Sequence, residues 1–343
     1  MHKSFRKIAK VSLVLVYLVI IAGAVVRMTG SGMGCPDWPK CFGYYIPPTQ
    51  ESELQWKAEK EYKKGQVIIR NEALLVAEMD FVTSSVFKDK NWTVYTKHDY
   101  AVFNPWHTWI EFVNRLFGAL AGLATLILAI FSLKYWKKKK WVTVFSWLVV
   151  FGMGFQAWLG ATVVYSVLEP VKITLHMVMA LIIVALILYV IYLSKQEIPP
   201  SIHDRTTFTF LISALLITIV QVVLGTQVRQ FVDGQIDLVG QNPHLWLQDP
   251  SLQFYIHRSF SIVVVLINLY LAYRIYKLNL NLFRINWVLL ILLAEVITGM
   301  AMYYWDFPFA SQPLHLVLAS LLFGVQFYLV LETYTFKRSP KSL

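Results

Sequence analysis

The sequence has 343 residues, of which 57% are hydrophobic and 15% are charged, and its net charge is +11. An ordinary soluble domain has about 25% charged residues, so this composition argues against a soluble globular protein. The positive charge would suit nucleic-acid binding, but Lys and Arg cluster beside the ends of apolar blocks, as in proteins oriented in a membrane. Alternating strand-like patterns are absent, which argues against an outer-membrane barrel. We therefore predict an all-α integral membrane protein with no nucleic-acid partner.

The first apolar run, residues 11–26, follows a basic N-terminus. A signal peptide has the same order of charge and hydrophobicity, but here Arg27 and a Thr-Gly-Ser-Gly stretch follow in place of a small-residue cleavage site. We expect an uncleaved membrane helix. No segment rich in Arg and Ser precedes it, which favours a bacterial plasma membrane.

Eight apolar blocks are each long enough to cross a hydrocarbon core of about 30 Å as a helix. A segment that spans the membrane is surrounded by membrane lipid and has to satisfy its own backbone hydrogen bonds. A helix is therefore the expected structure of each block. The predicted helices cover residues 11–27, 105–133, 141–165, 171–194, 207–228, 253–276, 286–304 and 313–335.

The short basic segments are the N-terminus, residues 134–140, 195–205 and 274–284, and the tail with Lys337, Arg338 and Lys341. An even number of helices puts all five on one side, which is the cytoplasm by the positive-inside rule. Both termini are therefore expected in the cytoplasm. The connections at residues 166–170, 229–252 and 305–312 are then expected outside.

The first outer loop, residues 28–104, is long and carries many Lys and Glu residues. Long loops are translocated with little regard to their charge, so these lysines do not upset the topology. Residues 52–64 could form an amphipathic helix. No catalytic pattern is present there, and we interpret the segment as a structural or partner-facing insertion.

Short segments recur in the two halves of the chain. Gly23-Ala-Val-Val-Arg27 corresponds to Gly225-Thr-Gln-Val-Arg229, residues 111–115 correspond to 254–258, and residues 170–176 correspond to 311–315. We predict two parallel four-helix bundle repeats, because both copies enter the membrane from the same side. They cover residues 1–194, including the long outer loop, and residues 207–336.

Three histidines, His176, His257 and His315, each lie within about two turns of the predicted outer end of a helix. Ionisable residues at membrane depth usually face the bundle interior, and neutral imidazole is a good ligand for haem iron. His257 and His315 lie at the same expected depth and could clamp one porphyrin between two helices. The alternative is an interhelical hydrogen bond from each histidine; the matched depth and the repeat favour haem.

The first repeat keeps His176 but has Asn114 where the second has His257. An amide is a poor iron ligand. His107 lies two turns earlier on the same face and could replace the missing ligand, although it would sit about 10 Å away along the helix. Alternatively, the iron has one protein ligand, His176, and an open face, which suits a reacting substrate.

Glu111 precedes Asn114 by one turn on the same helix face. The second repeat has Phe254 at the equivalent position, so a carboxylate is present on one side only. This asymmetry indicates chemistry in the first repeat and a cofactor in the second. The alternative is a structural ion pair between Glu111 and Arg115.

Four arginines lie near the predicted outer helix ends: Arg27, Arg115, Arg229 and Arg258. Arginine pairs well with carboxylates, and haem carries two propionates, so we expect propionate-binding or ordering roles for some of them. The alternative is interaction with lipid phosphate.

The chain has two cysteines, Cys35 and Cys41, both in the first outer loop. An oxidising compartment permits a disulfide between them, which could be structural or redox-active. A zinc site is less favoured, because two cysteines alone rarely complete one.

Taken together, these residues resemble the haem A synthase family. The resemblance rests on the segment Arg27-Met-Thr-Gly-Ser-Gly-Met-Gly-Cys-Pro-Asp-Trp38, the sequence Glu111-x-x-Asn-Arg115, and His176, His257-Arg258 and His315. It covers the chain apart from an insertion at about residues 45–100. The resemblance implies an oxidoreductase that converts the C8 methyl group of haem O to a formyl group through a hydroxymethyl intermediate, and so supplies haem A to terminal oxidases.

The resemblance also implies roles for single residues. Haem b would lie between His257 and His315, His176 would face the substrate haem O, Glu111 would be catalytic, and Cys35 and Cys41 would be the family's cysteine pair. Asn114 departs from the family pattern, which has histidine there. Implied partners are the enzyme that makes haem O and oxidase assembly factors.

Three other functions are less well supported. A membrane di-haem b-type electron-transfer protein would use both repeats alike, against which Asn114 and the single Glu111 argue. A transporter would place polar residues at the midplane, which looks apolar here. The haem-farnesylating enzyme of the same pathway would need Asp-rich magnesium sites, and no such cluster is present.

Overall fold

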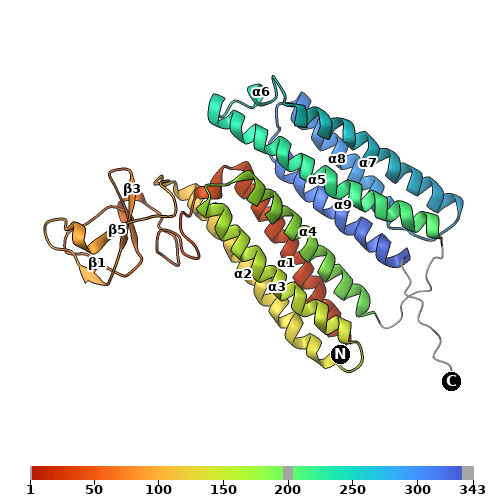
Figure 1. The fold of residues 1–343 in the computed structure, drawn as a ribbon, viewed down its shortest axis with the longest axis horizontal. Coiled ribbons are helices and arrows are strands. Elements are labelled where there is room, and N and C mark those ends of the chain that lie inside the picture. The colour runs from red at the N-terminus through yellow and green to blue at the C-terminus, as the bar shows by residue number, and fades with distance from the viewer. Residues whose placement is uncertain (1, 196–203, 334–343) are drawn as a thin grey trace. The chain divides into compact units, whose positions relative to one another are not determined.

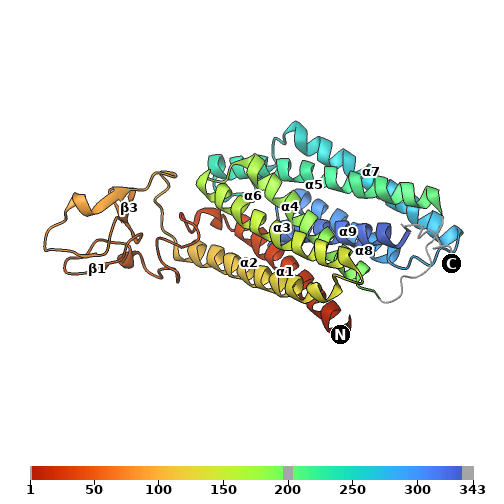
Figure 2. The ribbon, with the colours of Figure 1, turned by 60° about the horizontal axis from the view of Figure 1, so that its bottom comes forward.

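The computed structural model describes residues 2–195 and 204–333. In this part of the chain, eight helices are long and apolar enough to cross a membrane, which confirms the predicted all-α membrane class. The repeat arrangement and the orientation of the helices remain predictions. The helices in Figures 1 and 2 are α1 (His2–Met28), α2 (Pro105–Ser132), α3 (Lys140–Tyr165), α4 (Pro170–Leu193), α5 (Arg205–Val239), α7 (Leu252–Lys277), α8 (Ile285–Tyr304) and α9 (Ser311–Thr333).

The largest difference from the predicted helices is at the end of α5, which continues to Val239 although the apolar block ends near residue 228. The added turns mix charged and apolar residues, and an ion pair of 2.8 Å between Arg229 and Asp233 spans one of them. The helix stops at Gly240, whose φ of 71° is a conformation that favours glycine. The short helix α6 (Pro243–Trp246) follows, so the expected loop at residues 229–252 is largely helical.

The predicted basic segments are only partly described. Residues 196–203 and the tail with Lys337, Arg338 and Lys341 lie outside the described residues. The predicted cytoplasmic side therefore stays a prediction.

The segment between α1 and α2 contains two small antiparallel sheets. One pairs β1 (Glu61–Tyr62) with β4 (Phe81–Val82), and the other has β2 (Val67–Arg70), β3 (Ala73–Ala77) and β5 (Trp92–Val94) in the order β2-β3-β5. Figure 1 shows this segment in orange. Asn71 and Glu72, with φ of 50° and 58°, form the tight turn from β2 to β3.

The predicted amphipathic helix at residues 52–64 is wrong: the short 3-10 helix η2 (Glu51–Glu53) and strand β1 fall there instead. Its apolar residues do not form one stripe. Leu54 packs in a cluster with Val67, whereas Tyr62 packs in a second cluster with Ile68. Val67 and Ile68 are neighbours on β2 and face opposite sides of the strand, so the two clusters lie on opposite faces.

The chain divides into two compact units, which we call the Glu111 unit and the His315 unit. The Glu111 unit comprises Leu18–Gly122 and Met153–His176. The His315 unit comprises Met1–Tyr17, Leu123–Gly152 and Met177–Leu343. The predicted division of the chain into repeats at residues 194 and 207 stays a prediction.

In the His315 unit, α5 packs on α7 and α9, and α8 packs on α7 and α9 (Figure 2). The core between them is apolar and includes Leu211, Leu271, Val288 and Leu329. A buried polar link also joins two of these helices, because Gln326 of α9 donates a hydrogen bond of 3.0 Å to Asn268 of α7. Van der Waals packing and interhelical hydrogen bonds therefore both hold these four helices together.

Candidate functional site

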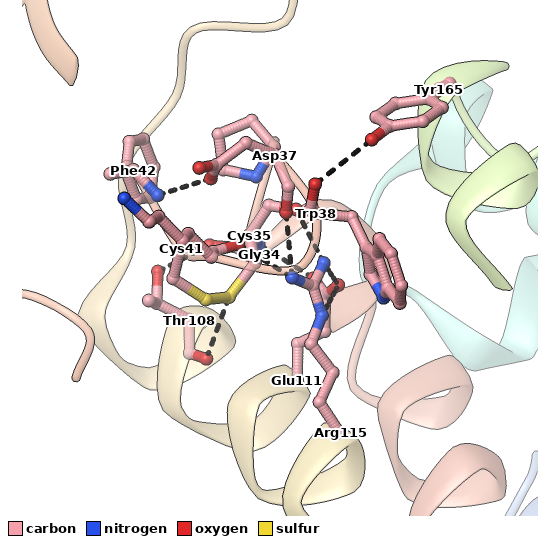
Figure 3. Close-up of polar contacts among 12 residues, drawn as sticks. Gly34, Cys35, Asp37, Trp38, Cys41, Phe42, Thr108, Glu111, Arg115 and Tyr165 are labelled. Carbon is pink, nitrogen blue, oxygen red and sulfur yellow. Dashed lines mark hydrogen bonds and ion pairs between the residues drawn. A yellow bond between two sulfur atoms is a disulfide. The ribbon is translucent and has the colours of Figure 1, made fainter. Parts of the chain in front are cut away.

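The carboxylate of Glu111 is buried near the start of α2, with 4% of the residue exposed. Its Oε2 accepts a hydrogen bond of 2.7 Å from the backbone N–H of Cys35, and its Oε1 accepts one of 3.1 Å from Arg115 Nε (Figure 3). A second guanidinium nitrogen of Arg115 forms an ion pair with the same carboxylate. A buried charge is tolerated only when it is paired in this way. The expected contact between Glu111 and Arg115 is therefore present, and the chemical role of Glu111 remains a prediction.

Arg115 also holds the loop that follows α1. It donates hydrogen bonds of 2.9 Å, 2.8 Å and 2.9 Å to the backbone carbonyls of Cys35, Asp37 and Lys40. The planar guanidinium has five N–H donors in a fixed arrangement, which suits it to several acceptors at once. Two roles were predicted for Arg115, propionate binding and ordering of the protein, and these contacts agree with the second.

Cys35 and Cys41 are joined by a disulfide that closes this loop. The loop lies against the first turns of α2, where Thr108 Oγ1 donates a hydrogen bond of 2.7 Å to the Gly34 carbonyl. A Cβ at Gly34 would collide with the backbone carbonyl of His107, so the close approach requires glycine. The disulfide and Gly34 together place the Cys35 N–H within hydrogen-bonding distance of Glu111.

Residues far away in the sequence hold the remaining carbonyls of the loop. Tyr95 donates a hydrogen bond of 3.3 Å to the Pro36 carbonyl, and His98 Nε2 lies 2.8 Å from the same oxygen. Tyr165 donates one of 3.2 Å to the Trp38 carbonyl (Figure 3). These three side chains were not predicted from the sequence, because their contacts span 59 to 127 positions and leave no local signal.

Asp37 stabilises the turn beyond the loop. Its carboxylate accepts hydrogen bonds from the backbone N–H groups of Phe42 and Gly43 (Figure 3). Burial raises the pKa of Asp37, and these two hydrogen bonds and the charge of Arg115 oppose that rise. Gly43 has a φ of 78°, and a Cβ there would collide with the Gly65 carbonyl, so the turn can have only glycine at this position.

His176, near the start of α4, faces Gly160 of α3. Its Cε1 lies 3.4 Å from the position that a Cβ on Gly160 would occupy. Gln156, one turn before Gly160, donates a hydrogen bond of 3.0 Å to the His176 carbonyl. The Nδ1 atom of His176 is buried and has no hydrogen-bond partner among the described residues. This ring nitrogen is an unsatisfied polar atom of the kind that a ligand would use.

Asn114 of α2 faces Gly23 of α1 in the same manner, with Oδ1 3.9 Å from the Cβ position of that glycine. This oxygen is also buried and unpartnered within the described ranges. His107 lies in the first turn of α2, and its backbone packs against Gly34. No contact links the His107 ring to this site in the described residues, and its role as a ligand remains a prediction.

The second pair of histidines lies in the His315 unit. The ring centres of His257 on α7 and His315 on α9 are 6.4 Å apart, and the ring planes make an angle of 73°. With metal–nitrogen bonds of about 2 Å on each side, two imidazoles on one metal ion have ring centres roughly 6 Å apart. Gly225 and Gly299 lie opposite the two rings, where a Cβ would be 3.2 Å and 3.5 Å from Cε1. These residues fit ligation of one haem iron.

A carboxylate contacts one of these two histidines. Glu295 of α8 has its Oε2 2.9 Å from His315 Nδ1, and Thr298 Oγ1 lies 2.9 Å from the same nitrogen. Glu295 was not among the residues predicted from the sequence. A lone carboxylate inside an apolar block was the available signal, because ionisable residues at membrane depth usually have a function.

The four candidate ligands share one local arrangement. Each faces a glycine on the neighbouring helix: Asn114 faces Gly23, His176 faces Gly160, His257 faces Gly225 and His315 faces Gly299. Four residues before each glycine stand Val19, Gln156, Gln221 and Glu295 in turn. Small residues let helices approach closely. The order of these contacts along the chain supports the predicted repeat.

The other arginines have separate contacts. Arg27 lies in the last turn of α1. Arg229 pairs with Asp233, and the Arg258 guanidinium lies over the Tyr303 ring at 5.6 Å. Binding of haem propionates by these three residues remains a prediction.

Comparisons with known proteins point to one family. The profile of the COX15-CtaA family, described as cytochrome oxidase assembly protein, matches residues 6–327. Proteins named heme A synthase from Ehrlichia canis and Flavobacterium johnsoniae are each 25% identical to this chain. The first alignment covers 92% of this chain and 89% of that protein, and the second covers 96% and 95%. A protein of the same name from Shewanella oneidensis is 26% identical over 63% of this chain and 54% of its own length.

Proposed function

This chain belongs to the COX15-CtaA family of cytochrome oxidase assembly proteins, and we propose that it is a haem A synthase that oxidises the C8 methyl group of haem O. The observation that carries this function is the buried Glu111 carboxylate, held by Arg115 and the Cys35 N–H. The equivalent position of the second repeat has Phe254, which stacks on Tyr303. A carboxylate in one repeat only supports one reactive site and one site for a permanent cofactor.

The proposed reaction has two oxidations. The first removes an electron pair and a proton from the methyl carbon of haem O, and water then adds to that carbon and releases a second proton to give the hydroxymethyl group. The second removes another electron pair and two protons to give the formyl group. The four electrons leave one at a time to four equivalents of a one-electron acceptor of the membrane. The oxidation develops positive charge on carbon, which a fixed carboxylate stabilises.

Glu111 is suited to this task because its position is fixed before any substrate arrives. One carboxylate oxygen accepts from Cys35, and the other accepts from Arg115, so the side chain does not have to reorganise. In the proposed mechanism, Glu111 stabilises the cationic carbon or accepts the proton that the attacking water releases. The disulfide loop lies against this carboxylate and contributes the Cys35 N–H that holds it.

His176 is the proposed protein ligand of the substrate iron. Asn114 of α2 faces Gly23 as His176 faces Gly160, but its side chain is an amide and not an imidazole. We therefore favour ligation of the substrate by one histidine, with Asn114 as a hydrogen-bonding neighbour of the open coordination position. His107 is the alternative second ligand.

His257 and His315 would hold a haem b, which supplies one-electron redox chemistry when bound. The ring separation of 6.4 Å and the glycine opposite each ring support this assignment. Arg27, Arg229 and Arg258 are the proposed partners of haem propionates. The proposed location is a bacterial plasma membrane with both termini in the cytoplasm. Proposed partners are the haem O-producing enzyme and oxidase assembly factors.

The experiment that tests this function is expression of the full chain in a host that makes haem O and no haem A. Haem is then extracted and separated by chromatography. Haem A, or its hydroxymethyl precursor, is expected only when the chain is present. Recovery of bound haem b with haem O unchanged would contradict the proposal and favour a di-haem electron-transfer protein.

A further inference from the structure

The carboxylate of Glu295 lies inside helix α8, in a stretch that is otherwise apolar. Its side chain is 12% exposed, and Oε2 lies 2.9 Å from Nδ1 of His315 on the neighbouring helix α9. Such a group is expensive in a membrane and normally has a functional partner. Within residues 2–195 and 204–333, the carboxylate of Glu295 pairs with His315, and its Oε1 has no hydrogen-bond partner.

Thr298 defines the direction of the hydrogen bonds at His315 Nδ1. Its Oγ1 lies 2.9 Å from the Ala294 carbonyl and 3.0 Å from the Glu295 carbonyl, so the hydroxyl hydrogen is directed to the helix backbone. The same oxygen lies 2.9 Å from His315 Nδ1 and is left there as an acceptor. His315 Nδ1–H therefore donates to two oxygens, Thr298 Oγ1 and Glu295 Oε2. This fixes the tautomer of the ring and leaves Nε2 as the atom that can bind iron.

In the described residues, no hydrogen bond or ion pair joins a carboxylate to the ring of another candidate ligand. Gln221 occupies the place equivalent to Glu295 beside His257, where its amide nitrogen donates a hydrogen bond of 3.1 Å to the backbone carbonyl of that residue and lies 3.5 Å from its Nε2. Gln156 donates a hydrogen bond of 3.0 Å to the backbone carbonyl of His176. Of the four equivalent places, a carboxylate stands only beside His315. The contact is therefore specific to one ligand and is not a general feature of the scaffold.

We propose that Glu295 is a positioning residue for the haem held by His257 and His315, and that its hydrogen bond to His315 keeps the reduction potential of that haem low. A carboxylate that accepts the Nδ1–H proton increases electron donation from the ring to the metal. This stabilises ferric over ferrous iron, and the low dielectric around a buried group strengthens the effect. The inference rests on the proposed haem site.

The test is a spectroelectrochemical titration of the purified full-length protein with its haem bound. The Glu295→Gln variant keeps the shape of the side chain and removes the charge, and we expect an upward shift of the midpoint potential with the low-spin spectrum retained. Glu295→Asp keeps a shorter carboxylate, and a smaller upward shift is expected. If Glu295→Gln retains no haem, the Glu295→Asp potential decides the question.

The matched control is Glu332→Gln. Glu332 pairs with Arg284 at 2.6 Å and lies 17 residues after His315 on α9, which is about 25 Å by helix rise. This variant loses the same charge without touching a histidine, and its potential is expected to equal that of the wild type. Equal potentials for the wild type and both Glu295 variants would overturn the inference.

The outcomes separate this inference from the proposed function. If the protein produces haem A but its midpoint potential does not change in the Glu295 variants, the tuning role alone is overturned. A shifted potential in a protein that makes no haem A would overturn the proposed function alone. A wild-type protein without low-spin haem would overturn both the haem site and the tuning role.

Discussion

The two candidate haem sites use the same helix contacts and place their carboxylates differently. In the Glu111 unit the carboxylate is on the helix of the candidate ligand, one turn before Asn114, and it is bound to the disulfide loop. In the His315 unit the carboxylate of Glu295 is on the neighbouring helix and is bound to the ligand itself. A carboxylate on the ligand's own helix can face a substrate, whereas one hydrogen-bonded to the ligand acts on the metal. The comparison shows how one scaffold can support reaction at one site and cofactor binding at the other.

The largest effect is expected for Glu111→Gln. Loss of the carboxylate charge should reduce haem A formation by about 10²- to 10⁴-fold, the range typical of a lost acid–base group. Haem binding at His257 and His315 should not change, because those residues belong to the other unit. Haem chromatography measures the product, and absorption spectra measure the bound haem.

A matched control for this variant is Glu169→Gln, which removes a charge from an exposed carboxylate paired with Lys172 at 2.9 Å. It should leave product formation within about two-fold of the wild type, as expected for an exposed ion pair of small energy. Equal activities of the Glu111 and Glu169 variants would remove Glu111 from the proposed mechanism.

The next effect is expected for His257→Asn, which gives the second site the residue of the first. The iron would keep His315 as its single protein ligand, so the low-spin spectrum of a haem with two histidine ligands should disappear. Absorption and electron paramagnetic resonance spectra check this. A low-spin spectrum that persists in both His257→Asn and His315→Ala would place the cofactor elsewhere.

The reciprocal variant, Asn114→His, gives the first site the residue of the second. Haem O bound there should become six-coordinate and low-spin, and it should lose binding of carbon monoxide, because the introduced imidazole would occupy the open position. Product formation should fall, while the spectrum of the haem at His257 and His315 stays the same. If carbon monoxide binding is already absent in the wild type, ligation by His176 alone is wrong and His107 becomes the better candidate.

A smaller effect is expected for the double variant Cys35→Ser and Cys41→Ser. Closing a loop of this size is worth about 2 kcal/mol in the chain-entropy description. The loss should appear mainly in the Glu111 unit, as faster proteolysis of the loop and reduced activity, since the Cys35 N–H is no longer held on Glu111. Limited proteolysis and haem A yield measure it. Full activity after the change would show that the hydrogen bonds of Arg115 and of the other side chains on the loop are enough to hold it without the disulfide.

The sequence predicted the parts of the molecule that follow from local patterns. Hydropathy located the eight helices of the described residues that are long and apolar enough to cross a membrane, because each apolar block is long. It did not predict the strands between α1 and α2, because strands of two to five residues have too few positions to show a period. The amphipathic pattern at residues 52–64 led to a wrong prediction because its apolar residues pack in two separate clusters.

For the candidate site, the sequence identified residues whose chemistry is unusual for a membrane, namely Glu111 and the three histidines. Tyr95, His98 and Tyr165 were missed because ordinary polar residues of loops and helix ends reveal a role only through tertiary contacts. Glu295 differs from these. It stands in an apolar block with no neighbouring basic residue, and the rule that selected Glu111 applies to it equally.

The smallest effects are expected from alanine at the glycines opposite the candidate ligands, and they test whether the two sites are packed alike. At Gly225 a Cβ would lie 3.2 Å from the His257 ring, so Gly225→Ala should displace the ring and weaken haem retention by about 1 kcal/mol, at the low end for an overpacked core. At Gly299 the distance is 3.5 Å, an ordinary contact, and a smaller effect is expected. At Gly23 the nearest atom, Asn114 Oδ1, is 3.9 Å away, so the higher helix propensity of alanine should prevail and stabilise the protein by up to about 1 kcal/mol. Thermal unfolding and haem retention of the three variants measure this order, and a loss at Gly23 as large as that at Gly225 would show that the Asn114 site is packed as tightly as the His257 site.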